Sequence, residues 1–113
     1  MTAAGSAKSR KAESGDETAG NIPEHTARRR ATIRNQRGLH ARAAARFAKL
    51  AGTFNAEIAV SRSGQTVSGV SIMGLMMLAA GIGCEIEVSA AGPEAGRALD
   101  ALCLLIDDKF EED

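Results

Sequence analysis

The side chain best suited to chemistry in this sequence is the imidazole of His40, in the segment Arg37-Gly38-Leu39-His40-Ala41-Arg42. Imidazole is partly neutral near pH 7 and is then a competent nucleophile. Because a helix is predicted from residue 41, His40 lies where free backbone N–H groups and the helix dipole favour an anion. Arg42 lies in the same first turn and can donate paired hydrogen bonds to phosphate oxygens. These residues indicate a histidine that carries a phosphoryl group transiently.

Plainer interpretations of His40 stay open at this stage. A single histidine at a helix start is also typical of a capping or surface residue. A metal site is disfavoured, since no second histidine, cysteine or carboxylate lies at ligand spacing. Cys84 and Cys103 form no CxxC pair, and we expect both to be core residues in a reducing cytosol. We therefore expect neither a metal nor a cofactor.

A second candidate is Ser71, which precedes the apolar run Ile72-Met73-Gly74-Leu75. The sequence predicts that Ser71 caps a helix, its oxygen accepting a backbone N–H, which contributes about 1 kcal/mol. This run and its continuation hold more apolar side chains than one helix face can bury. We expect most of them in the core and one or two, chiefly Ile72 and Met73, exposed as a partner-docking patch beside the histidine. Leu39 is a further expected member of that patch.

Seven elements are expected to position these residues. Period-two alternation predicts strands, whereas apolar residues three or four apart predict helices. In chain order they are a strand at 31–34, a helix at 41–51, strands at 57–61 and 65–68, a helix at 71–80, a strand at 84–89 and a helix from 93 onward. The connections around the hairpin are too short for parallel pairing. The order βαββαβα therefore predicts an α+β fold, a four-stranded antiparallel sheet with three helices on one face.

The domain is expected to cover residues 29–113. Residues 1–28 hold almost no large apolar side chains, so we interpret them as a disordered N-terminal tail. No segment has the roughly 20 consecutive apolar residues of a membrane span. The N-terminus also lacks the apolar block of a secretory signal. We expect a cytoplasmic protein without membrane insertion.

Charge is segregated along the chain, although the formal net charge of the 113 residues is zero. Residues 28–62 carry nine Arg or Lys against Glu57 alone, whereas residues 63–113 are strongly acidic. The basic segment predicts a positive surface potential and raises nucleic-acid binding as an alternative function. The acidic second half and the absence of Trp and Tyr argue against that function. We expect no nucleic-acid partner, and we interpret the arginine triplet at 28–30 as a solvated lead-in to the first strand.

Three segments carry a recognisable combination of motifs: GLHARAAARFAKLA, EIAVSRSGQTVSGVSIMGLMMLAAGIG and EIEVSAAGPEA. They resemble the HPr family, the histidine-containing phosphocarriers of the bacterial phosphotransferase system. The resemblance covers residues 31–110 without an obvious gap. The GLHxR core, followed some thirty residues later by SIMGLM, makes the match specific.

The resemblance implies that enzyme I phosphorylates His40 on Nδ1, with phosphoenolpyruvate as the phosphoryl source. His40 would pass the group to a histidine of an enzyme IIA protein, and Arg42 would assist. The implied fold is an open-faced β-sandwich. Ser71 matches the family's regulatory serine, the target of HPr kinase/phosphorylase. The resemblance thus predicts a monomeric phosphoryl-transfer intermediate for sugar uptake or regulation, and not a self-contained enzyme.

Two positions depart from the family pattern. Ala43 stands where the family usually has proline, which fixes the backbone of the first turn, and Ala41 stands where it often has threonine. The long tail has no counterpart in a typical member. A second function also stays open, that of a non-transport regulatory module acting through its phosphorylation state at His40 and Ser71.

Overall fold

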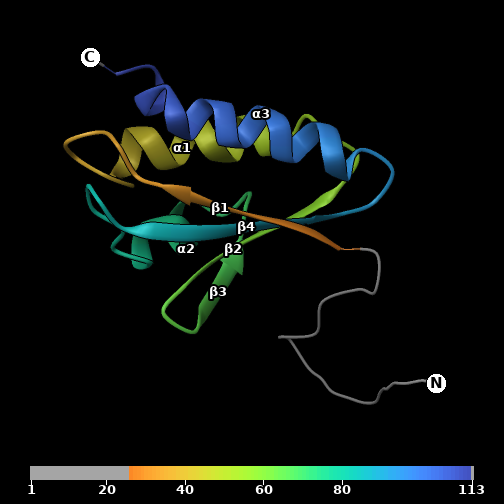
Figure 1. Ribbon diagram of the computed structural model, residues 1–113, viewed down its shortest axis with the longest axis horizontal. Helices are drawn as coiled ribbons and strands as arrows, with labels where there is room; N and C mark the ends of the chain where they lie inside the picture. The colour runs from red at the N-terminus through yellow and green to blue at the C-terminus, as the bar shows by residue number, and fades with distance from the viewer. Residues whose placement is uncertain (1–25, 113) are drawn as a thin grey trace.

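The computed structural model describes residues 26–112. Its strands and helices follow one another in the predicted order: β1 (Ala27–Thr32), α1 (Ala41–Ala51), β2 (Glu57–Arg62), β3 (Gln65–Ser68), α2 (Ile72–Met77), β4 (Glu85–Ala91), α3 (Ala95–Asp107) and a 3-10 turn, η1 (Lys109–Glu111). The four strands form one antiparallel sheet in the order β1-β4-β2-β3 (Figure 1). The predicted α+β fold, an open-faced β-sandwich, is confirmed.

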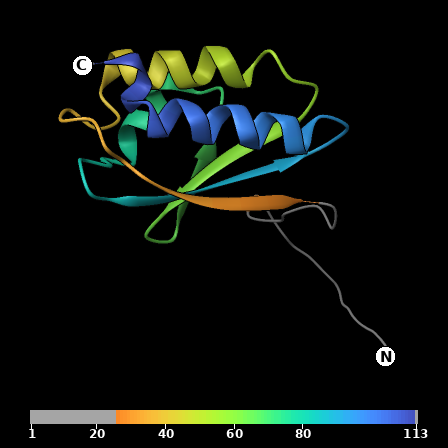
Figure 2. The same cartoon turned by 45° about the horizontal axis from the view of Figure 1, so that its top comes forward.

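The sheet has one covered face and one open face. Val60 of β2 pairs with Val88 of β4, and both side chains are fully buried. Helices α1 and α3 lie over this face (Figure 2), and α2 packs against α1 and β3. On the opposite face the cross-strand pairs are polar, such as Arg30 of β1 beside Glu87 of β4. This alternation explains why the strands have a period of two in the sequence.

Each long helix buries one stripe of small and apolar side chains. In α1 the stripe consists of Ala43, Ala44, Phe47, Ala48 and Ala51. In α3 it consists of Ala95, Ala98, Leu99, Leu102, Leu105 and Ile106. Burying one large apolar side chain contributes about 1.5–3 kcal/mol. The core therefore fixes the orientation of α1, and with it the position of the residues at the start of that helix.

The first strand begins earlier than expected. β1 starts at Ala27, and Ala27 and Arg28 pair with Ala90 and Ser89 of β4. The domain boundary expected at residue 29 is therefore two residues late, and the arginine triplet lies inside the strand, not before it. The pattern is uninformative there because β1 is an edge strand whose first four residues are exposed. Residues 1–25, the rest of the expected tail, lie outside the described residues.

Helix α2 is shorter than its apolar run. The run extends to Ala80, but the helix ends at Met77. The amides of Leu78 and Ala79 donate to carbonyls only three residues back, and Ala79 has a φ of 52°. A left-handed residue cannot continue a right-handed helix. Within residues 26–112, no helix has the length and apolar character needed to cross a membrane.

Candidate functional site

The loop before α1 is held against the segment that follows α2. Gly38 has a φ of +66°, and a Cβ at this position would lie 2.3 Å from the carbonyl oxygen of Ala80. The next amide, Leu39 N–H, donates to that same oxygen over 2.9 Å. Leu39 is only 5% exposed, so the expectation that it belongs to an exposed docking patch is wrong. Its side chain instead anchors the loop in the core.

His40 is the N-cap residue of α1. Its backbone is extended (φ −74°, ψ 179°), and its carbonyl accepts the first helical hydrogen bond, from Ala44 N–H, over 2.8 Å. The amides that follow it, from Ala41 to Ala43, precede the first intrahelical donor and point out of the helix end. The imidazole is 21% exposed, so it is neither free in solvent nor sealed in the interior. A small anion can therefore reach the ring and the helix start together.

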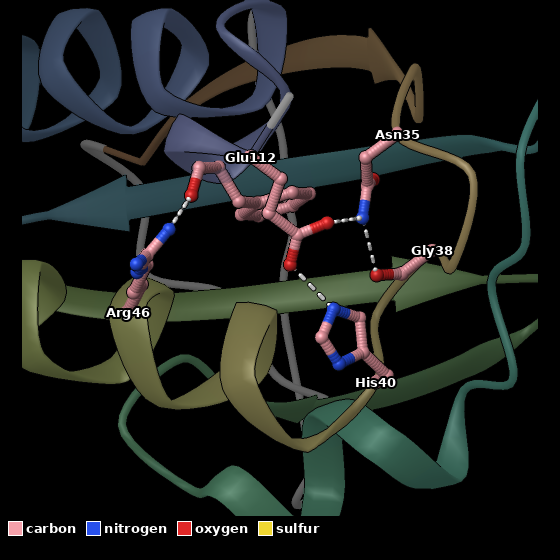
Figure 3. A network of polar contacts seen from close by, with 6 residues as sticks. Asn35, Gly38, His40, Arg46 and Glu112 are labelled. Carbon is pink, nitrogen blue, oxygen red and sulfur yellow. Dashed lines mark hydrogen bonds and ion pairs between the residues drawn. The ribbon is translucent and has the colours of Figure 1, made fainter.

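A glutamate from the C-terminal end of the chain contacts the ring. The Glu112 Oε2 atom lies 2.5 Å from Nε2 of His40 (Figure 3). The other ring nitrogen, Nδ1, makes no hydrogen bond within the part of the chain that the structure describes. Sequence reasoning missed Glu112 because it lies 72 residues from His40 in an acidic C-terminal stretch without a motif. The site is thus a histidine–carboxylate pair with one open nitrogen.

Asn35 holds the second oxygen of this carboxylate. Its Nδ2 donates to Glu112 Oε1 over 3.0 Å and to the carbonyl oxygen of Gly38 over 2.9 Å. Asn35 is only 2% exposed, and its Oδ1 has no hydrogen-bond partner among the described residues. An unpaired buried polar atom costs about 1–3 kcal/mol. Asn35 links the glycine loop, the glutamate and, through it, the histidine into one network.

The C-terminal turn that carries Glu112 is pinned at two points. Phe110 is completely buried, and the Arg46 guanidinium of α1 donates to its carbonyl oxygen (Figure 3). Lys109, Phe110 and Glu111 all have left-handed backbones, with φ of 56°, 56° and 65°. Consecutive non-glycine residues rarely adopt this conformation, so tertiary contacts must hold it. Arg46 therefore holds the turn in place from α1.

The electrostatics keep the Glu112 carboxylate ionised. Burial raises the pKa of Glu112, but the hydrogen bonds from Asn35 and His40 and the charges of His40 and Arg46 together hold that pKa below its usual value. At neutral pH this side chain is therefore a hydrogen-bond acceptor only. Its partner at Nε2 must supply the proton.

Arg42 lies exposed in the first turn of α1. Within residues 26–112 its guanidinium makes no hydrogen bond and no ion pair. The side chain is therefore close to His40 in the chain and uncommitted. Its predicted contribution to phosphate binding stays a prediction.

Ser71 caps α2 as predicted. Its backbone is extended, and its Oγ accepts from the Gly74 amide over 3.0 Å. The side chains that follow it depart from expectation, since Leu75 is the only residue of α2 that is buried. Six large apolar side chains on α2 and in the segments next to it are exposed, and we refer to them together as the α2 patch: Val70, Ile72, Met73, Met76, Met77 and Ile82. The expectation that most of this run lies in the core is wrong. A short surface helix packs against the core with one face, and in α2 that face carries Leu75.

Both cysteines are half-buried, and neither forms a disulfide. Cys84 packs against the hydrophobic core, as expected, whereas Cys103 is not among the core residues. The Cys84 Sγ accepts a hydrogen bond from Arg62 over 3.3 Å. Burial raises the pKa of the Cys103 thiol, which makes it a poor nucleophile. Among the described residues no cluster of His, Cys, Asp and Glu has the makings of a metal site.

Comparison with known proteins places this geometry in a family. Residues 27–108 match the family model described as the PTS HPr component phosphorylation site. The chain belongs to the HPr family. It is a phosphocarrier protein of the phosphotransferase system. The match begins at Ala27, where β1 begins.

Known HPr proteins resemble the chain in both sequence and structure. The phosphocarrier protein HPr of Cupriavidus necator is 49% identical over 81 residues, which cover 72% of this chain and 91% of that protein. The phosphocarrier protein NPr of Shewanella violacea is 46% identical over 84 residues, covering 74% and 92%. A crystal structure of HPr from Thermoanaerobacter tengcongensis superimposes with a TM-score of 0.74 at 38% identity, covering 77% of this chain and 98% of that one.

Proposed function

We propose that His40 accepts a phosphoryl group on Nδ1 from phospho-enzyme I and passes it to a histidine of an enzyme IIA protein. The observation that carries this proposal is the state of the His40 ring. It is partly exposed at the N-cap of α1, with Nε2 bound to Glu112 and Nδ1 open (Figure 3). A neutral imidazole with its lone pair on Nδ1 is a nucleophile for phosphorus. Phosphorylation at Nε2 would require the ring to leave the carboxylate.

The start of α1 supplies electrostatic stabilisation for the transferred group. The three backbone amides after His40 have no acceptor within the helix, so they are free to donate hydrogen bonds to phosphoryl oxygens. The helix dipole adds positive potential at the same place. In this chain Ala43 keeps an amide proton that a proline in its place would lack. Arg42, exposed in the same turn, contributes charge-assisted hydrogen bonds to the phosphoryl oxygens. The site therefore binds the group without any metal in the proposed mechanism.

The α2 patch is the proposed docking surface for both protein partners. Ile72 is 43% exposed and Met73 is 72% exposed, and α2 packs against α1, whose N-cap residue is His40. Exposed apolar groups gathered on one helix and beside it mark a protein-binding surface. Methionine side chains adapt to partners of different shape, as a carrier between two proteins requires.

Ser71 is the proposed regulatory position. It lies at the edge of the α2 patch, and its modification by HPr kinase/phosphorylase would add a charge of about −1.5 to −2 there. That charge repels acidic partner surfaces and weakens docking. A carrier modified at this serine would exchange phosphate with enzyme I more slowly.

The proposal is tested by incubation of the full chain with a bacterial enzyme I and phosphoenolpyruvate. We expect one acid-labile, base-stable phosphate per molecule, located on His40 by mass spectrometry. The variant His40→Ala should take up none. Phosphate that persists on another residue of this variant would overturn the assignment.

A regulatory phosphorelay is the second candidate function, since similarity to an NPr protein nearly equals that to an HPr protein. In that case the carrier works without sugar uptake and acts through its phosphorylation state at His40 and Ser71. Capture of acceptors with the phosphorylated chain distinguishes the two: a sugar-specific enzyme IIA supports transport, and a regulatory protein supports the alternative. In either function we propose a monomer that acts in the cytoplasm.

A further inference from the structure

We propose that Glu112 is a positioning residue that holds the His40 ring in the tautomer with its proton on Nε2, so that Nδ1 presents its lone pair for phosphoryl transfer. This inference rests on the proposed function of His40 and deepens it. The observation that carries it is the 2.5 Å contact between Glu112 Oε2 and His40 Nε2, in a pair of side chains that are only 17% and 21% exposed.

The tautomer follows from hydrogen-bond chemistry. An ionised carboxylate has acceptors and no donor, so Nε2 must provide the proton of this contact. A neutral imidazole carries one proton, which leaves Nδ1 with a free lone pair. The contact also fixes the ring plane, and this determines where Nδ1 points relative to the start of α1. Glu112 thus acts through His40 and touches no reacting atom.

The surrounding network fixes the orientation of the Asn35 amide, which holds one oxygen of the Glu112 carboxylate. Asn35 Nδ2 donates to Glu112 Oε1 and to the Gly38 carbonyl oxygen, so a flipped amide would set its own oxygen against two acceptors. The unpaired Asn35 Oδ1 and the left-handed backbone at residues 109–111 both lower stability. Costs of this kind gather where a functional geometry is maintained.

Phosphoryl transfer proceeds with Glu112 in this position throughout. The Nδ1 lone pair attacks phosphorus of the phosphohistidine of enzyme I, and an N–P bond forms. The N–P bond to the donor histidine breaks, and its electron pair stays on the donor nitrogen. The Nε2 proton stays on the ring, facing Glu112, whose negative charge offsets the positive charge that the phosphorylated ring acquires. The reverse sequence of events delivers the group to an acceptor histidine.

Replacing Glu112 by glutamine gives a sharp test, because glutamine keeps the shape and reverses one hydrogen bond. Asn35 donates to Oε1, so the glutamine oxygen must face Asn35 and its NH₂ group must face Nε2. Nε2 then becomes an acceptor, the ring proton moves to Nδ1, and the nucleophilic lone pair is lost. Glu112→Ala removes the contact without imposing the wrong tautomer. A purely structural role predicts that glutamine is tolerated better than alanine, whereas positioning predicts the opposite order.

The experiment combines two measurements on the full chain. Nitrogen-15 NMR at a pH where the ring is neutral identifies which nitrogen of His40 carries the proton. Initial rates of phosphorylation are measured with enzyme I and phosphoenolpyruvate, and with phosphoramidate, a small donor that needs no docking. We expect wild type to be fastest, Glu112→Ala slower and Glu112→Gln slowest, with a loss of about tenfold or more for glutamine because the wrong tautomer removes the nucleophilic lone pair. The matched control is Glu111→Gln, which changes the exposed neighbouring acid and should leave both measurements unchanged.

The outcomes separate this inference from the function on which it rests. If Glu112→Gln keeps the Nε2–H tautomer, or matches the wild-type rate with both donors, the positioning role is wrong while phosphorylation of His40 stands. If the wild-type chain takes no phosphate from enzyme I, the carrier function is wrong, and the tautomer comparison still reports on Glu112. Circular dichroism of each variant confirms that the fold is retained.

Discussion

Gly38 lies so close to Ala80 that a Cβ at residue 38 would be 2.3 Å from the Ala80 carbonyl oxygen. The same oxygen accepts the Leu39 amide proton, so it cannot move away without breaking a hydrogen bond. This contact joins the loop before His40 to the segment after α2. The distance between His40 and the α2 patch is therefore set by the backbone and not by flexible side chains.

The Gly38–Ala80 contact predicts a large effect of Gly38→Ala. We expect a loss of about 2–4 kcal/mol in the free energy of unfolding, because the left-handed backbone and the steric overlap both oppose the methyl group. Urea denaturation of both proteins measures this difference in the free energy of unfolding. Gly64→Ala is the matched control, since Gly64 also has a positive φ (+82°) but nothing within 4 Å of the added Cβ. Equal losses for the two variants would show that the Ala80 contact is unimportant.

The Ser71 cap predicts a smaller loss of stability, which a second capping residue restores. Ser71→Ala leaves the Gly74 amide without its acceptor, and we expect a loss of about 1 kcal/mol in unfolding free energy. Ser71→Asn restores a capping oxygen and should regain most of that loss. A stable alanine variant would mean that water serves the amide equally well.

The α2 patch predicts a specific docking defect. Met73 is 72% exposed, so Met73→Asp should leave stability nearly unchanged and raise the KM of enzyme I for the carrier about tenfold. Leu104→Asp is the control, because Leu104 is 68% exposed on α3, outside the patch. Steady-state phosphorylation at varied carrier concentration provides both values. A similar KM for the two variants would place docking elsewhere.

The Glu112 carboxylate predicts an acid-dependent share of stability. Its pKa is lower in the folded chain than the ordinary value of 4.5, so the folded state favours the ionised form. That contribution is complete above pH 4.5 and is lost as the pH falls through the folded pKa. The difference in unfolding free energy between wild type and Glu112→Gln should therefore shrink below pH 4.5. A difference that does not change across this range would show that the ionised carboxylate of Glu112 adds no stability through its hydrogen bonds with Asn35 and His40.

Sequence reasoning was most accurate where the structural cause is local. The helix at 41–51 matches α1 in both bounds, and the strand at 65–68 matches β3. Alternation and helical spacing report which face of an element is buried, whatever the element packs against. The errors lie where burial depends on distant segments: Leu39 is in the core, and most of the α2 run is exposed.

By itself, the sequence determined the order of the elements, the helix that begins after His40 and the serine that caps α2. These properties depend on residues a few positions apart, because backbone geometry and capping act over one or two turns. Only the tertiary structure decided that Glu112, 72 residues away, contacts the His40 ring, with Asn35 bound to the same carboxylate. Burial of Phe110 and a left-handed turn bring that carboxylate into place, and such packing leaves no periodic pattern in the chain.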